Sequence, residues 1–140
     1  MSASTHMPTP LQSLIAGQWR DASGDKYATF YPHDHSEVAQ LHAATRQDVD
    51  ETIEFAERAR LKPNWAGLKP HERAGILNRI ALGIRNRAED LAQLQRLDNG
   101  KPISETRALV ASAAGTFQYF ASACETLEDT ITPARGDFIT

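Results

Sequence analysis

The stretch HERAGILNRIALGIRNRAEDLAQLQRLDNGKP, residues 71–102, decides the fold class of this chain. Its first half carries apolar residues at helical spacing, and Pro70 just before it suits the first turn of a helix. Asn86 and Glu89 form a capping-box pattern, which predicts a second helix, or a bend, within the stretch. Asn, Gly and Pro at 99–102 end that helix. The apolar residues of the first helix are Ile76, Leu77, Ile80 and Ile84.

Further helices are predicted on both sides of this stretch. Thr45 offers its hydroxyl to the start of a helix and has Asp48 three positions later, which is another capping-box pattern. The segment 62–69, with its Pro, Trp and Gly, breaks that helix. The last predicted helix runs from residue 104 to about residue 127. The predicted apolar faces are Val49, Ile53 and Ala56 in the earlier helix and Leu109, Ala113, Phe117, Phe120 and Cys124 in the later one.

Short strands are predicted nearer the two ends. Segments 14–19 and 26–31 are rich in β-branched and aromatic residues and flank a turn-rich stretch at 23–25, which predicts a β-hairpin. A weaker apolar alternation at 38–41 follows a loop and predicts a third strand. Two strand beginnings are predicted at 130–132 and 137–140.

The composition is typical of a folded protein, and the length is that of a single domain. Of its 140 residues, 41% are hydrophobic and 24% are charged. Residues 1–12 have neither a basic start with an apolar core nor an arginine, so we expect a flexible lead and place the folded part at 13–140.

Charge and cysteine content restrict the partners and the compartment. A net charge of -3 gives no general attraction for phosphate backbones or anionic lipid, so we expect no nucleic acid and no membrane partner. The sequence has no apolar run of the roughly 18 residues needed to span a bilayer. A single cysteine predicts a reducing compartment, which we take to be the cytoplasm.

Several motifs resemble the aldehyde dehydrogenase superfamily in their order and spacing. They are LIAGQW from Leu14, HERAGILNRIALGI from His71, LDNGKP from Leu97 and FQYFA from Phe117, together with Trp65. The LDNGKP motif is similar to that of the betaine-aldehyde-like and broad aliphatic branches. One departure is Tyr31, because the family usually places asparagine before the proline.

The resemblance implies an α/β parent fold. Within it, this segment would be mostly α-helical with a short amino-terminal β-hairpin, an incomplete part of the Rossmann-like cofactor-binding domain that ends at the start of the oligomerisation strand region. It also implies the family's chemistry: a cysteine thiolate attacks an aldehyde, NAD or NADP accepts hydride, and a water activated by glutamate releases the acid. The family's catalytic and cofactor-binding residues come later in the chain, so we expect no catalytic residue here and no cofactor bound by this chain alone.

Cys124 and the pair His33 and His35 are candidate functional residues. For both we favour an interpretation without a catalytic or metal-binding role. Cys124 lies on a predicted apolar helix face without a nearby His or Lys, which predicts a buried thiol and not a nucleophile. His33 and His35 supply too few ligands for a structural zinc, so we expect solvated turn residues. No GxGxxG or GxxxxGK[ST] motif occurs, so the sequence contains no self-contained nucleotide-binding loop.

Asp98 is the candidate metal ligand. It lies at the predicted end of a helix, where carbonyl oxygens lack partners and the helix dipole favours a cation. Several family members bind potassium or sodium here, and the resemblance carries that K+ or Na+ site to Asp98 and to the backbone oxygens of Thr29 and Phe30. The alternative is a helix end that is capped by Asn99 and Gly100.

Three interpretations of function follow. The chain is the amino-terminal segment of an aldehyde dehydrogenase and is not catalytically competent alone, or it is a truncated or split helical module that acts as a binding or assembly partner, or it is a structural domain that has lost the chemistry. Its apolar helix faces predict self-association or association with the rest of a dehydrogenase, because exposing several such side chains is costly.

Overall fold

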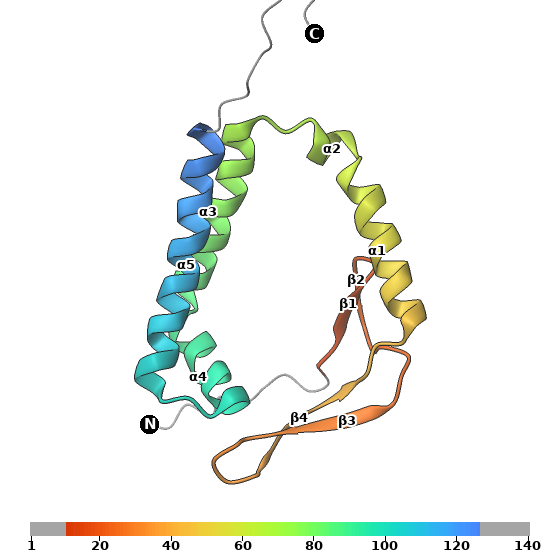
Figure 1. Cartoon of the computed structure of the whole chain (residues 1–140), viewed down its shortest axis with the longest axis vertical. Helices are drawn as coiled ribbons and strands as arrows, with labels where there is room; N and C mark the ends of the chain where they lie inside the picture. Colours follow the sequence, from red (N-terminus) through yellow and green to blue (C-terminus); the bar gives the residue numbers. More distant parts are fainter. Residues whose placement is uncertain (1–10, 127–140) are drawn as a thin grey trace, which may run out of the picture.

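The computed structural model describes residues 11–126 of the chain, and these form four strands and five helices. The strands are β1 (Ser13–Ile15), β2 (Gln18–Arg20), β3 (Lys26–Phe30) and β4 (Glu37–His42). The helices are α1 (Arg46–Arg60), α2 (Pro63–Ala66), α3 (Pro70–Asn86), α4 (Ala88–Asn99) and α5 (Ile103–Thr126). Figure 1 shows an open frame: α3 and α5 form one side and α1 the other, α2 joins them at one end, and the β3–β4 ribbon crosses the other end. The predicted strands at 130–132 and 137–140 lie outside the described residues.

The strands pair differently from the predicted hairpin. β1 pairs with β2, and β3 pairs with β4, both in antiparallel fashion. The hairpin predicted between 14–19 and 26–31 is therefore wrong, whereas the strand predicted at 38–41 is confirmed as β4. The cause is the Ala16–Gly17 turn, where φ is 50° and 80°, because positive φ at both central residues makes the two-residue turn that reverses a chain directly. The turn-rich stretch instead becomes a connection in which the Gly24 amide donates to the carbonyl of Ala43 at 2.9 Å.

Local signals place most of the helix ends correctly. Thr45 caps α1 in a capping box with Asp48, Pro70 opens α3, and Gly100 ends α4 in the left-handed conformation with φ of 72°. The capping box predicted for Asn86 and Glu89 is wrong, although a new helix does begin there. α3 continues through Asn86, and α4 follows Arg87 without a side-chain cap.

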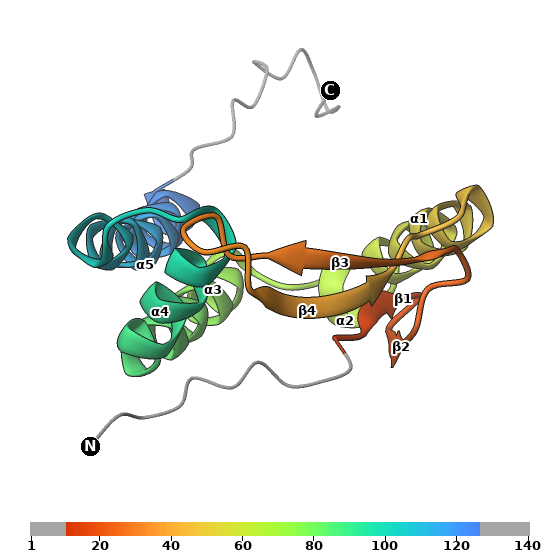
Figure 2. The same cartoon turned by 90° about the horizontal axis from the view of Figure 1, so that it is seen from below.

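The Glu89 carboxylate bonds to side chains elsewhere and not to the start of α4, which explains why the predicted capping box does not form. It accepts two hydrogen bonds, each of 2.8 Å, from the Arg107 guanidinium of α5. It also accepts a bond of 3.0 Å from Gln93. The side chain that would have closed the box therefore ties α4 to α5 (Figure 2 shows the two helices from below).

The main packing contact is a seam of small residues between α3 and α5, which make the most extensive contact of any two described elements. Small side chains allow the two helix backbones to approach closely, so the helix faces that carry them pack against each other. The buried residues of α3 are Ala74 and Ala81, and those of α5, which packs on both α3 and α4, are Thr106, Val110, Ala114 and Ala121.

The predicted apolar face of α5 lies beside this seam and is not the buried face. Leu109 and Phe120 are exposed, Phe117 is half-buried, and Cys124, which was expected to be buried, is half-buried as well. On α1 the predicted face is likewise open, because Val49 and Ile53 are exposed.

The described residues bury almost no large apolar side chain. Their buried hydrophobic residues are seven alanines with Ile15 and Val110, and the largest fully buried side chain is that of Thr106. By contrast, 14 large hydrophobic residues are exposed. A stable domain reverses this balance, because burial of large apolar side chains is the dominant favourable term in folding.

We predict that the seam rejects larger side chains. Ala81→Leu should destabilise the chain by about 1–3 kcal/mol, because extra methylenes in a packed contact force the helices apart. Gly83→Ala, two positions along α3, should stabilise it by about 0.5–1 kcal/mol, because a methyl group there meets nothing within 4 Å and glycine disfavours helix. Urea unfolding followed by circular dichroism measures both changes. A neutral Ala81→Leu would contradict the close packing.

Candidate functional site

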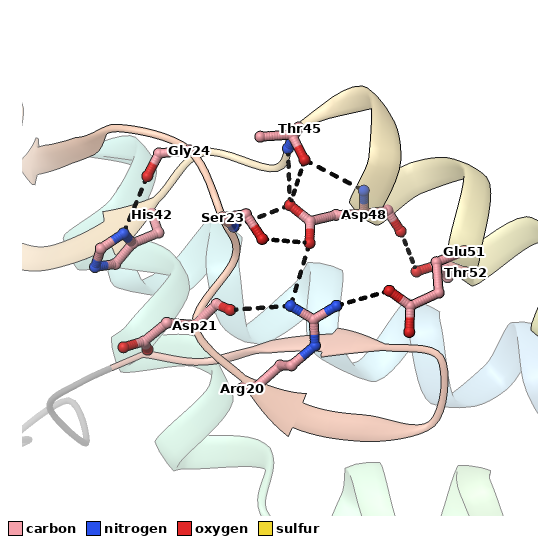
Figure 3. Close-up of polar contacts among 9 residues, drawn as sticks. All are labelled: Arg20, Asp21, Ser23, Gly24, His42, Thr45, Asp48, Glu51 and Thr52. Atoms are coloured by element: carbon pink, nitrogen blue, oxygen red, sulfur yellow. Dashed lines mark hydrogen bonds and ion pairs between the residues drawn. The ribbon is translucent and has the colours of Figure 1, made fainter.

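The most densely bonded side chain in the described residues is the carboxylate of Asp48, which is 2% exposed in the first turn of α1. Its Oδ2 atom accepts hydrogen bonds from the amides of Ser23 and Thr45, both at 2.9 Å, and from the Thr45 hydroxyl at 2.8 Å. Its Oδ1 atom accepts from the Ser23 hydroxyl at 2.9 Å and from the Arg20 guanidinium at 3.2 Å. Figure 3 shows these groups converging from β2, the following connection and α1.

Arg20 extends this cluster along α1. Its Nη2 atom donates to Glu51 at 2.9 Å, while Nη1 contacts Asp48 and, at 3.4 Å, the carbonyl of Asp21. The guanidinium therefore bridges two successive turns of the helix from strand β2 (Figure 3). The arrangement fixes how α1 sits on the β1–β2 pair.

Hydrogen bonding sets the charge state of this cluster. The backbone hydrogen bond from Ser23, followed by the backbone and hydroxyl bonds from Thr45, holds the pKa of Asp48 well below its ordinary value. The carboxylate consequently stays ionised and has no proton to give. Its two oxygens already accept five hydrogen bonds, so little capacity remains for a substrate or a metal ion. The cluster is structural and not catalytic.

The elements of the predicted cation site do come together. α4 contacts β3, and Asp98 lies exposed in the last turn of α4. Thr29 and Phe30 end β3, where the pairing register with β4 shifts between them. One carboxylate with backbone carbonyl oxygens is a donor set that suits a hard monovalent cation.

The alternative capping interactions are also present at this helix end. The Gly100 amide donates to the carbonyl of Arg96 at 2.9 Å, and the Lys101 amide donates to the side chain of Asn99 at 3.0 Å. Gly100 also lies against Pro32, since an added Cβ would be 3.0 Å from the proline Cβ. Beside it, the Arg96 guanidinium stacks 5.7 Å from the centre of the Tyr31 ring. The end of α4 is thus packed on the loop that follows β3.

The other candidates remain apart. His33 and His35 lie exposed in the loop between β3 and β4, where the His33 ring packs 5.7 Å from that of Tyr31. Among residues 11–126, no group of three or more His, Cys, Asp or Glu side chains is placed to hold a metal ion. Within the same range, no helix has the length and apolar character needed to cross a membrane.

Sequence reasoning missed the partners of Asp48. The capping-box pattern identified Asp48 only as a local cap, and Arg20 stands 28 positions earlier with no pattern of its own. The one available signal was the turn-rich stretch at 23–25, where a serine amide and hydroxyl are free to bond outside the local chain.

Comparison with known proteins identifies what the chain is similar to. The model of the aldehyde dehydrogenase family matches residues 19–140. Betaine aldehyde dehydrogenase 1 of Rhizobium meliloti is 40% identical over 130 residues, which cover 89% of this chain and 26% of that protein. A betaine aldehyde dehydrogenase of Cereibacter sphaeroides is 38% identical over 122 residues, covering 85% of this chain and 24% of that protein. The chain thus spans about a quarter of the length of these curated relatives.

Solved structures agree with these relatives. An NAD-dependent aldehyde dehydrogenase from Sinorhizobium meliloti matches with a TM-score of 0.85 and 26% identity, over 97% of this chain and 28% of that one. An NAD-dependent benzaldehyde dehydrogenase from Corynebacterium glutamicum matches with a TM-score of 0.83 and 25% identity, over 91% of this chain and 28% of that one. The open frame therefore recurs inside chains that are several times longer.

We predict that Asp48→Asn destabilises the chain at neutral pH. The side-chain NH2 group of asparagine would face N–H and O–H groups that now donate to the carboxylate, and neither side could accept. The pKa of the carboxyl is lowered from 3.8 on folding, so its stabilisation is fully present above pH 3.8 and is lost progressively below it. The difference in Tm between the wild type and the variant should therefore shrink in acid. Glu51→Gln is the control, since the Glu51 side chain is half exposed and a smaller effect is expected. A difference that does not vary with pH would contradict this account.

Proposed function

Because this chain belongs to the aldehyde dehydrogenase family and corresponds to its amino-terminal segment, we propose that the complete protein oxidises an aldehyde to a carboxylic acid with NAD or NADP. Residues 13–140 would form the amino-terminal part of its cofactor-binding domain. The observation that carries the proposal is the family match over residues 19–140, together with the recurrence of the same frame in an NAD-dependent aldehyde dehydrogenase at a TM-score of 0.85. The similarity to betaine aldehyde dehydrogenases makes betaine aldehyde the first substrate to test.

The role of this segment is to shape the enzyme and not to perform its chemistry. NAD or NADP would accept a hydride when bound, and the cysteine that forms the thiohemiacetal would come from sequence beyond this chain. The described residues support that division, because Asp48 has its hydrogen bonds filled and Cys124 lies half-buried near the end of α5. A split helical module that works only as a binding partner is the alternative, which the family match does not favour.

Location and association are parts of the same proposal. A single cysteine supports a reducing cytoplasm. The exposed apolar side chains support association, either with a second copy or with the remainder of a dehydrogenase, because association would remove them from water.

We further propose that the complete protein binds K+ or Na+ through the Asp98 carboxylate and the backbone oxygens of Thr29 and Phe30. The contact between α4 and β3 supports it, as does the negative end of the α4 dipole.

Activity is tested with the chain alone and with a chimera in which it replaces the matching quarter of the Rhizobium meliloti enzyme. The chain alone should show no aldehyde-dependent reduction of NAD or NADP, because a reaction that needs a thiolate, an oxyanion hole and a base cannot be assembled around the single thiol of Cys124. The chimera should oxidise betaine aldehyde at a rate within about tenfold of the parent, since the chemistry lies outside the exchanged segment. Turnover by the chain alone that Cys124→Ser abolishes, or a folded but inactive chimera, would refute the proposal.

Cation binding is tested by the Tm of that chimera in KCl or NaCl, compared with N-methylglucamine chloride at equal ionic strength. The metal salt should raise the Tm of the chimera and should have no such effect on Asp98→Asn. Removing a carboxylate from a helix end shifts the Tm by itself, so the salt dependence is the quantity compared. Asp90→Asn, an exposed acid in the first turn of α4, should keep the metal response. A response that persists in Asp98→Asn would rule out the site.

A further inference from the structure

Tyr31 connects the loop between β3 and β4 to α4, and it stands at the position where the sequence departs from the family pattern. Its half-buried ring lies 5.7 Å from the Arg96 guanidinium in the last turn of α4. A guanidinium over the face of a tyrosine is attracted by the charge distribution of the ring. Next to it, Pro32 lies against Gly100, where an added Cβ would be 3.0 Å from the proline Cβ. Figure 2 shows the loop beside α4.

Arg96 has no other charged partner in the part of the chain that the structure describes. None of the ion pairs found there includes it. Its Nε atom is buried there without a hydrogen-bond partner. Arg96 and Asp98 stand two positions apart in α4, and side chains at that spacing do not face each other on a helix. The contact that holds the guanidinium is therefore the one with the Tyr31 ring.

The loop between β3 and β4 is closed by its own hydrogen bonds. The Tyr31 amide donates to the carbonyl of Ser36 at 2.8 Å, and the His35 amide donates to the carbonyl of Tyr31 at 2.9 Å. The amide and hydroxyl of Ser36 both donate to the Asp34 carboxylate, at 2.9 and 2.6 Å. The loop is thus a compact unit attached to the end of β3, and a contact made by Tyr31 positions the whole unit.

The strand ladder alone does not fix where this unit lies. The pairing register with β4 shifts between Thr29 and Phe30, so one strand has an extra residue at this point. An extra residue bends a strand pair and increases its twist. The direction of the chain after Phe30 then depends on contacts outside the ladder, and the stack of Tyr31 on Arg96 is such a contact.

Building on the cation site of the proposed function, we infer that Tyr31 is a positioning residue for that site and acts through its contact with Arg96. The contact sets how far the backbone oxygens of Thr29 and Phe30 lie from the Asp98 carboxylate. Cavity size and the flexibility of the ligands decide how well a set of oxygen atoms holds a given cation. Loss of the contact therefore weakens binding, although Tyr31 itself supplies no ligand.

The test measures the KCl concentration that gives half of the maximal rise in the Tm of the chimera, with N-methylglucamine chloride keeping the ionic strength constant. Tyr31→Leu should raise this concentration about fivefold or more, because the ring that holds Arg96 is lost. Tyr31→Phe keeps the ring face and should change it by less than about twofold. Tyr27→Leu is the matched control, since Tyr27 is an exposed tyrosine of β3 that makes no cation–π contact within residues 11–126.

Arg96→Met separates positioning from charge repulsion. Removal of a positive charge near the end of α4 would by itself make a cation bind more tightly. If the stack positions the ligands, the same variant binds K+ more weakly, so its half-effect concentration should rise as it does in Tyr31→Leu. The double variant should be no weaker than either single variant, because both changes remove the same contact. Methionine keeps helix propensity, and circular dichroism checks that α4 remains.

Two results would overturn the positioning role while the cation site stands. One is a half-effect concentration in Tyr31→Leu equal to that of the wild type, even if its Tm is lower at every KCl concentration. The other is tighter K+ binding by Arg96→Met, which also decides the matter should Tyr31→Leu not fold.

A wild-type chimera whose Tm does not respond to KCl would refute the cation site and the positioning role with it. The readout does not depend on turnover, so an inactive chimera that responds to KCl refutes the proposed activity without affecting this test. Should the chimera fail to fold, the same titrations are made on the chain alone, which contains Thr29, Phe30 and Asp98, and the same outcomes decide.

Discussion

The close approach of α3 and α5 is the constraint from which the rest of the structure follows. Alanines such as Ala81 and Ala114 line the contact, and they let the two helices pack along much of their length. Small side chains release little hydrophobic free energy when they are buried, so the contact orders the helices without forming a large core. Large apolar residues of these helices, such as Leu109 and Phe120, consequently lie outside the contact and are exposed.

Polar bonding takes the place of a core on the other side of the frame. The buried residue of α1 is Asp48, whose carboxylate is held by five hydrogen bonds. Burying a carboxylate is tolerable only with such complete pairing, so the geometry of β2, the following connection and α1 is specified closely. The cluster orients α1 while Val49 and Ile53 on its apolar face stay exposed.

The proposed function assigns the shape of the enzyme to this segment and its chemistry to other sequence. The described residues supply helix ends and a strand ribbon, and their most strongly bonded acid is fully occupied with structure. Family membership therefore rests on the order of motifs and on the frame, and not on a catalytic constellation.

The sequence by itself determined the features that depend on neighbours along the chain. The cap at Thr45, the start of α3 at Pro70 and the end of α4 at Gly100 are set by backbone geometry within a few residues, and the motifs from Leu14 to Phe117 identified the family. Only the tertiary structure decided which strands pair, which column of α5 is buried and what Asp48 binds. Those outcomes depend on contacts between parts of the chain that are far apart in sequence, such as Arg20 with Asp48 or α3 with α5. Helical periodicity cannot tell which of two adjacent apolar faces of a helix is buried, because burial depends on how closely the partner helix can approach each face.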